Sequence, residues 1–274
     1  MTYYSALNLT KEPFSTSPDP YFLYPSVSHK QALQRLEISV RLKRGLNLIL
    51  GDVGIGKTTL ARALVQNLNQ DSAIATHMIL DPEYESEFQF ISYIAKLFGI
   101  KPNYRSTLDY KEAIERFLFR KCVDQQDIVV LIIDEAQKLN ASSFEILRTL
   151  LNYETNEYKL LQLVIIGQTE LLPKLKRIRN FSDRISLKYI LNPLDINETK
   201  SMIGFRLQQA GYDSERTLFT DKAVELIYQH TQGYPRRIAN VCHFALEELV
   251  MREEPVVEEN LIAEVIERDR KVGF

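Results

Sequence analysis

Hydrophobic residues in the first two thirds of the chain form short continuous runs, and these runs alternate with segments of helical periodicity. The runs predict strands at residues 46–50, 74–80, 128–133, 161–166 and 185–190, and the continuous β-branched run at 128–133 predicts a fully buried one. Between them, apolar residues recur every three or four positions and predict amphipathic helices at residues 87–98, 110–122 and 142–151. Strands that alternate with helices predict an α/β fold with a parallel sheet flanked by helices.

The pattern changes at both ends of this region. After Pro193 the hydrophobic positions predict helices only, at residues 196–209, 221–229, 236–251 and 259–270. Residues 12–24 are too rich in proline for regular structure and too rich in aromatics for a free tail, and Ser28 is placed to cap a helix over residues 29–43. We therefore predict an amino-terminal strap (1–27), an α/β core (28–192) and a small α-helical lid domain (193–274).

Composition and charge narrow the class of protein. The 274 residues are 45% hydrophobic and 26% charged, enough for one sizeable core and a smaller satellite domain. The apolar runs are shorter than the roughly 20 residues of a membrane-spanning helix, and the polar start does not resemble a signal peptide, so we expect a cytoplasmic protein. A net charge of −2 gives no global attraction to nucleic acid. Cys122 and Cys242 lack metal-ligand spacing, which favours reduced core thiols.

A glycine-rich loop directly follows the first predicted strand and precedes a helical pattern. It comprises Gly51, Asp52, Val53, Gly54, Ile55, Gly56, Lys57, Thr58 and Thr59. Glycines let the backbone N–H groups surround phosphates, the helix adds the positive end of its dipole, and Lys57 brings a mobile charge to the outer phosphates. Thr58 is placed to bind magnesium. The loop predicts a nucleoside triphosphate site, and an ordinary glycine-rich turn is the weaker alternative.

Two carboxylates follow the buried strand at residues 128–133. Ligands of buried parallel sheets lie beyond the carboxyl ends of the strands, which is where Asp134 and Glu135 stand. Asp134 could bind the magnesium ion or its water, and Glu135 could orient and deprotonate the attacking water. The alternative is an Asp-Glu pair that caps a helix.

These motifs and three further segments, all in order, carry a resemblance to a known family. The further segments are Pro13-Phe14 with Ser17-Pro18-Asp19-Pro20 and Phe22-Leu23-Tyr24, then LLQLVIIGQTEL, then TQGYPRRIANVCHFAL. With GDVGIGKTTL and LIIDEAQKL they resemble the ATPase domain of the ExeA, or general secretion pathway protein A, family over nearly the whole chain. The resemblance implies an AAA+ ATPase that uses ATP and Mg²⁺. It also implies that Gln168 is a polar sensor between the carboxylates and the γ-phosphate, and that Arg236 is the sensor arginine of the lid.

Arginines are candidates for contacting the γ-phosphate. Arg236, at the start of a lid helix, could cross to it and swing the lid after hydrolysis, while Arg237 or a plain surface arginine is the alternative. An arginine finger from a neighbouring subunit would couple hydrolysis to assembly of a homo-oligomer. Arg184 is the first choice for this finger and Arg179 the second, with an ordinary salt-bridge role as the alternative for either.

Two further features allow a binding role or a structural one. Four cations fall within six residues, as a contact to a DNA phosphate backbone requires: Lys174, Lys176, Arg177 and Arg179. A solvated helix face is the alternative for this basic stretch. In the strap, Phe14 or Tyr21 could stack on adenine, and core packing is the alternative.

Two functional hypotheses share the ATPase and differ in what it drives. The first, implied by the resemblance, is assembly or remodelling of a secretion or pilus complex. Because the chain ends at Phe274 without a membrane helix or periplasmic part, this role calls for a separate membrane partner that holds it peripherally at the inner membrane. The second is a DNA-associated regulator of transposition that selects targets, which the basic stretch favours and the acidic balance does not. A scaffold that binds ATP without turnover is disfavoured by Glu135 and the sensor positions.

Overall fold

The computed structural model describes residues 2–101, 104–178, 180–213 and 217–272, and the chain divides into two compact units. The helical unit comprises Met1–Ser28, Val53–Thr59 and Asn192–Phe274. The sheet unit comprises His29–Asp52 and Leu60–Leu191. Residues 53–59 of the glycine-rich loop therefore group with the helical unit, although the chain on either side of them belongs to the sheet unit.

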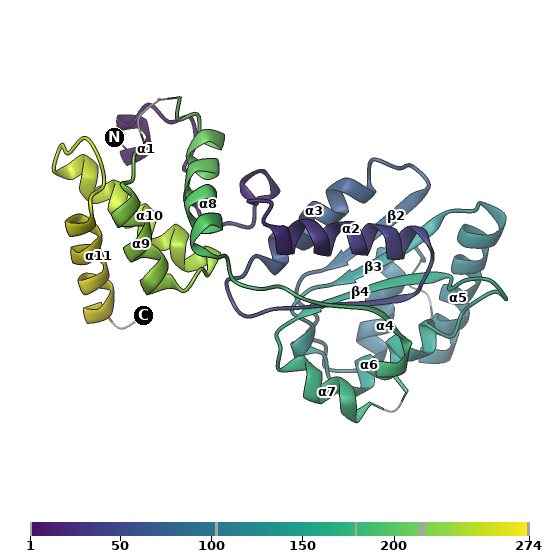
Figure 1. The fold of residues 1–274 in the computed structure, drawn as a ribbon. Helices are drawn as coiled ribbons and strands as arrows, with labels where there is room; N and C mark the ends of the chain where they lie inside the picture. The colour runs from purple at the N-terminus through teal and green to yellow at the C-terminus, as the bar shows by residue number, and fades with distance from the viewer. Residues whose placement is uncertain (1, 102–103, 179, 214–216, 273–274) are drawn as a thin grey trace. The chain divides into compact units, whose positions relative to one another are not determined.

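The sheet unit is built on five parallel strands in the order β2-β3-β4-β1-β5 (Figure 1). The strands are β1 (Leu46–Leu50), β2 (Ile74–Ile79), β3 (Ile128–Ile133), β4 (Leu161–Gly167) and β5 (Ile185–Ile190). Every residue of β1 and β4 is buried, whereas β5, at an edge, alternates between half-buried and exposed positions. The parallel α/β fold predicted from the apolar runs is confirmed.

Helices cover both faces of this sheet. Figure 1 shows α2 and α3 on one face and α4 and α6 on the other. The bounds are α2 (Val27–Arg41), α3 (Lys57–Leu68), α4 (Glu87–Leu97), α5 (Thr107–Phe119), α6 (Ala141–Leu150) and α7 (Leu171–Arg177). The core between the sheet and α4 to α7 is apolar and includes Phe90, Phe144 and Phe181.

Three local predictions need correction. Ser28 lies inside α2, which begins at Val27, so Ser28 is not its cap. The helix predicted at residues 110–122 begins at Thr107, because the Ser106 hydroxyl accepts a hydrogen bond from the Asp109 N–H and caps it there. The short helix α7 was not predicted as a separate element, since seven residues give too few turns for a clear periodicity.

The helical unit contains α8 (Ile196–Gln209), α9 (Asp221–Thr231), α10 (Pro235–Met251) and α11 (Glu259–Val272), with the short α1 (Tyr3–Ala6). Residues 1–28 pack in this unit. Phe14 is 1% exposed and meets Phe219 edge to face in the helical core. The Arg206 guanidinium donates to the Ser15 carbonyl at 3.2 Å, and burial lowers the pKa of Arg206 to about 10. The domain boundaries drawn from the sequence stay a prediction.

Two smaller findings complete the fold. Within the described ranges, the structure has no helix with the length and apolar character needed to cross a bilayer. Both cysteines are buried free thiols, and burial raises the pKa of Cys122 and of Cys242.

Gly233 sets the entry into α10. Its φ is +76°, and a Cβ at this position would lie 1.9 Å from the Leu194 carbonyl oxygen. The Leu194 N–H also donates to the Gly233 carbonyl at 3.0 Å. Only glycine fits this left-handed turn, which leads directly into Pro235 and Arg236.

We expect Gly233→Ala to lower the free energy of unfolding by about 2 kcal/mol or more, because the methyl group meets backbone that cannot move aside. Gly204→Ala is the matched control: Gly204 lies in α8, and a Cβ there meets nothing within 4 Å. This control should gain roughly 0.5–1 kcal/mol. Urea denaturation of both variants checks the prediction, and equal stability of the two would contradict it.

Candidate functional site

The glycine-rich loop connects β1 to α3. At its start, the Gly51 N–H donates to the Gly167 carbonyl at 3.2 Å, and the Thr169 hydroxyl donates to Asp52 Oδ1 at 3.3 Å. These bonds hold the beginning of the loop against the carboxyl end of β4. The loop ends at Lys57, which is the first residue of α3.

The middle of the loop contacts the start of α10 within the helical unit. The Arg236 N–H donates to the Gly54 carbonyl at 3.1 Å, and a Cβ at Gly54 would lie 3.0 Å from the Arg236 Cβ. Gly54 has φ +80°, so a side chain here would be strained and crowded. The Arg237 guanidinium lies 5.1 Å from the ring centroid of Tyr234. Of the two neighbouring arginines, Arg236 is therefore the one at the loop.

Two charged residues of the predicted site, Lys57 and Asp134, are buried. Lys57 is 5% exposed and Asp134 is 1% exposed. Proteins bury such groups where they are paired or bind a ligand, because an isolated charge is costly to remove from water. Lys57, Thr58 and Thr59 form the first turn of α3, and the positive end of the helix dipole favours an anion there.

Each of these groups has the chemistry that a triphosphate with magnesium requires. The ammonium of Lys57 and the N–H groups of the helix start are donors for phosphate oxygens. The hydroxyl of Thr58 and the carboxylate of Asp134 are oxygen ligands of the kind that Mg²⁺ takes. The glycine at position 54 lets the loop lie against the start of α10, because a Cβ there would meet the Arg236 side chain.

The carboxylate pair lies at the carboxyl end of β3. Glu135 adopts a left-handed conformation with φ +50°, which is uncommon for a residue other than glycine and recurs at functional sites. Its N–H donates to Asp134 Oδ1 at 2.9 Å. Its carboxylate accepts a hydrogen bond from the Gln137 amide, with 2.5 Å between Nε2 and Oε2.

Gln137 also contacts the predicted sensor. The Gln168 N–H, just after β4, donates to Gln137 Oε1 at 3.2 Å. The structure therefore joins Glu135 and Gln168 through one amide side chain. The sequence analysis did not single out Gln137. The sequence feature that could have pointed to Gln137 is its position two residues after Glu135, in the turn that follows β3.

Arg184 lies at the end of the sheet where the parallel strands begin, opposite the end where Asp134 and Gln168 follow their strands. It ends the turn that precedes β5, so it stands at the amino-terminal side of a parallel strand. Its guanidinium donates to the Arg148 carbonyl at 3.3 Å and to Asn152 Oδ1. The second finger candidate, Arg179, lies outside the described residues.

The cations of the basic stretch have two kinds of environment: one is bound to backbone carbonyls and two are exposed. The Lys174 ammonium donates to the Gln137 carbonyl at 3.0 Å and to the Leu139 carbonyl, and so holds the turn that follows Glu135. Lys176 and Arg177 are exposed at the end of α7. In the described part of the stretch, these two are the cations on the surface.

The strap gives a further correction. Because Phe14 lies in the helical core, the prediction that it stacks on adenine is wrong and the core-packing alternative holds. Tyr21 is 51% exposed, with the Lys11 ammonium 4.4 Å from its ring centroid.

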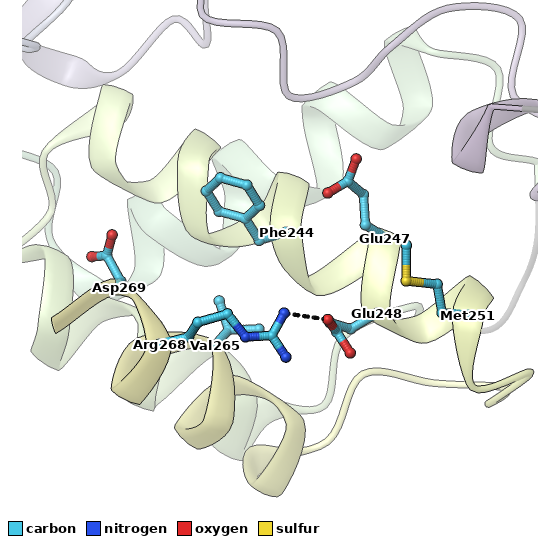
Figure 2. Close-up of a pocket in the computed structure, with 7 residues that line it drawn as sticks. All are labelled: Phe244, Glu247, Glu248, Met251, Val265, Arg268 and Asp269. Carbon is cyan, nitrogen blue, oxygen red and sulfur yellow. Dashed lines mark hydrogen bonds and ion pairs between the residues drawn. The ribbon is translucent and has the colours of Figure 1, made fainter. Parts of the chain in front are cut away.

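The helical unit also has an apolar groove of about 380 Å³ between α10 and α11 (Figure 2). Phe244, Met251 and Val265 supply its apolar lining, and Arg268 donates to Glu248 at 2.5 Å across it. All its lining residues come from these two helices, so the groove is separate from the phosphate loop.

The chain is similar in sequence to known proteins. The family model described as the AAA domain matches residues 40–175. General secretion pathway protein A of Aeromonas hydrophila is 36% identical over 247 residues, which are 89% of this chain and 44% of that protein. The chain thus spans less than half the length of this relative.

Solved structures show the same fold. The ORC2 protein of Aeropyrum pernix has a TM-score of 0.68 at 18% identity, over 94% of this chain and 71% of that one. A chain of Drosophila ORC bound to DNA has a TM-score of 0.69 at 20% identity, over 95% of this chain and 65% of that one. The family model, the secretion-pathway relative and the fold together show that the chain belongs to the AAA+ P-loop ATPases of the general secretion pathway protein A type.

Proposed function

We propose that the chain is a magnesium-dependent ATPase that hydrolyses ATP to ADP and phosphate. The observation that carries the proposal is the strand order, in which β4 lies between β1 and β3. The phosphate loop, Gln168 and the Asp134-Glu135 pair therefore follow three adjacent strands at the same edge of the sheet. Adenine as the base rests on the family resemblance.

The residues divide the work as follows. Backbone N–H groups of the loop, other than that of Gly51, and the Lys57 ammonium hold the phosphates, while Thr58 and Asp134 would hold magnesium. Magnesium, when bound, neutralises charge on the phosphate oxygens. Glu135 orients the attacking water and accepts its proton. Gln168 stands beside it, on the strand end between the loop and the carboxylates.

Arg236 is suited to report the state of the nucleotide. It is tied to Gly54 of the phosphate loop through its backbone, so a change in the loop acts on the start of α10. We propose that Arg236 senses the γ-phosphate and that its release after hydrolysis moves the lid helices.

Arg184 is suited to act in a neighbouring subunit. It lies at the amino-terminal edge of its own sheet, and its own phosphate loop lies at the carboxyl-terminal edge. An arginine so placed cannot serve its own site, and a finger in trans would make hydrolysis depend on a homo-oligomer.

The process that the ATPase drives is proposed from the relative. General secretion pathway protein A is named for a secretion pathway, and we propose that this chain assembles or remodels a complex of the secretion or pilus type. It would work in the cytoplasm, at the inner membrane through a partner.

A role on DNA is the second candidate. Lys176 and Arg177 are exposed on α7, and the structure with a TM-score of 0.69 is of an ORC chain whose complex is bound to DNA. Regulation of transposition by target selection would fit such binding. Lys174 contributes less to it than the sequence implied, because its ammonium is occupied by two carbonyl groups.

Lys57→Ala should weaken ATP binding, because the ammonium that contacts the outer phosphates is lost. Glu135→Gln should bind ATP with unchanged affinity and hydrolyse it at least about 100-fold more slowly, since the general base is lost. Calorimetric titration and phosphate release measure the two effects. Turnover by Glu135→Gln at the wild-type rate would show that the catalytic assignment is wrong.

Arg184→Ala should lose about 10³-fold in turnover if it is the finger. Mixing this variant with Lys57→Ala should restore part of the activity, because the second variant lends its intact Arg184 to the intact site of the first. Phosphate release from a titration of one variant into the other measures this gain. A mixture that is no more active than its parts would rule out a finger in trans.

DNA binding separates the two candidate processes. If DNA is a partner, Lys176→Ala combined with Arg177→Ala should reduce the slope of log K against log salt by about 2 for double-stranded DNA, because two phosphate contacts are lost. Fluorescence anisotropy with ATP and magnesium measures it. Binding that is undetectable in the wild type, or unchanged in the variant, would remove this surface as a DNA site.

A further inference from the structure

Gln137 occupies a central place at the candidate site. Its amide nitrogen donates to the Glu135 carboxylate at 2.5 Å, and its amide oxygen accepts the Gln168 N–H at 3.2 Å. Both polar groups of the Gln137 side chain are thus engaged, one with the second residue after β3 and one with the first residue after β4. A shift of this side chain changes the position of the Glu135 carboxylate relative to Gln168.

The backbone around Gln137 is held as well. It lies in the single 3₁₀ turn Ala136–Lys138, and Ala136 is fully buried. The Lys174 ammonium, from α7, donates to the Gln137 carbonyl at 3.0 Å. Gly167 leaves room for the amide, because a Cβ there would lie 3.1 Å from Gln137 Oε1.

The backbone of Glu135 does not fix the position of its carboxylate, so a neighbouring side chain is needed to hold it. A glutamate side chain has three rotatable bonds, and a left-handed backbone at Glu135 does not by itself fix where the carboxylate points. A general base acts efficiently only within hydrogen-bond reach of the proton that it accepts. A misplacement of about 1 Å can cost on the order of 10²-fold in rate.

We propose that Gln137 is a positioning residue that holds the Glu135 carboxylate for water activation and ties it to the backbone of Gln168. The inference rests on the proposed ATPase function and adds to it a residue that acts through Glu135. Lys174 supports the same arrangement from α7 by fixing the carbonyl of Gln137.

Gln137→Met tests this directly, because methionine keeps the length of the side chain and removes both hydrogen bonds. We expect kcat for ATP to fall about 10- to 100-fold while KM and the Kd for ATP stay within about twofold. Lys138→Met is the matched control in the same turn, since the Lys138 ammonium pairs with Asp81 at 2.9 Å and no described hydrogen bond joins its side chain to Glu135. The backbone hydrogen bond from the Lys138 N–H to the Glu135 carbonyl, at 3.0 Å, does not depend on the side chain and is kept in this variant. Its kcat should stay close to that of the wild type.

A second variant distinguishes the loss of the hydrogen bond to Glu135 from a general loss of folded structure. Gln137→Glu keeps an acceptor for the Gln168 N–H and loses the donor to Glu135, so it should also lower kcat with KM unchanged. In a Glu135→Ala background, Gln137→Met should lower the residual single-turnover rate no further, because a residue that acts through Glu135 has nothing left to position.

The outcomes separate the inference from the proposed function. A wild-type kcat in Gln137→Met and Gln137→Glu would overturn the inference and leave the ATPase standing. An equal fall in the Glu135→Ala background, or an equal fall in Lys138→Met, would also overturn it, since either marks a structural role. A wild-type chain that does not hydrolyse ATP would overturn both together.

Discussion

The pairing of β4 with β1 on one side and β3 on the other is the constraint on which the candidate site depends. Because all three strands run parallel, their carboxyl ends meet at one edge, and the phosphate loop, Gln168 and Asp134-Glu135 follow them there. No single side chain could bring these segments together. The apolar core that packs the sheet therefore also determines the geometry of the proposed chemistry.

Two charged side chains of the candidate site are buried. Lys57, at the start of α3, and Asp134, directly after β3, are nearly inaccessible, whereas most of the other buried residues are apolar. Their burial is costly unless partners or a ligand offset it, and a magnesium-bound triphosphate supplies the complementary charges. Glu135 adds a left-handed backbone conformation. The buried charges and the left-handed residue thus lie where the proposed ligand binds, and uncommon backbone conformations are frequent at active sites.

The elements with a strong physical signal were predictable. Buried strands such as Ile128–Ile133 appear in the sequence as unbroken apolar runs. The phosphate loop is recognisable from the spacing of its glycines before Lys57. Other features depend on contacts between distant residues. One is the start of α2 at Val27, whose N–H donates to the Glu198 carboxylate, and another is the burial of Phe14 against Phe219. Gln137 was missed for the same reason, since its importance comes from Gln168, which is 31 residues away. The helix α7 was missed for a different reason, because its seven residues give too few turns for a clear periodicity.

The most direct test of the account is a crystal structure of the Glu135→Gln chain with ATP and magnesium. We expect electron density for the triphosphate within the loop of residues 51–59. The Lys57 ammonium should contact the outer phosphates, and the metal should lie between Thr58 and Asp134. Nucleotide bound elsewhere, or a loop that stays empty at saturating ATP, would contradict it.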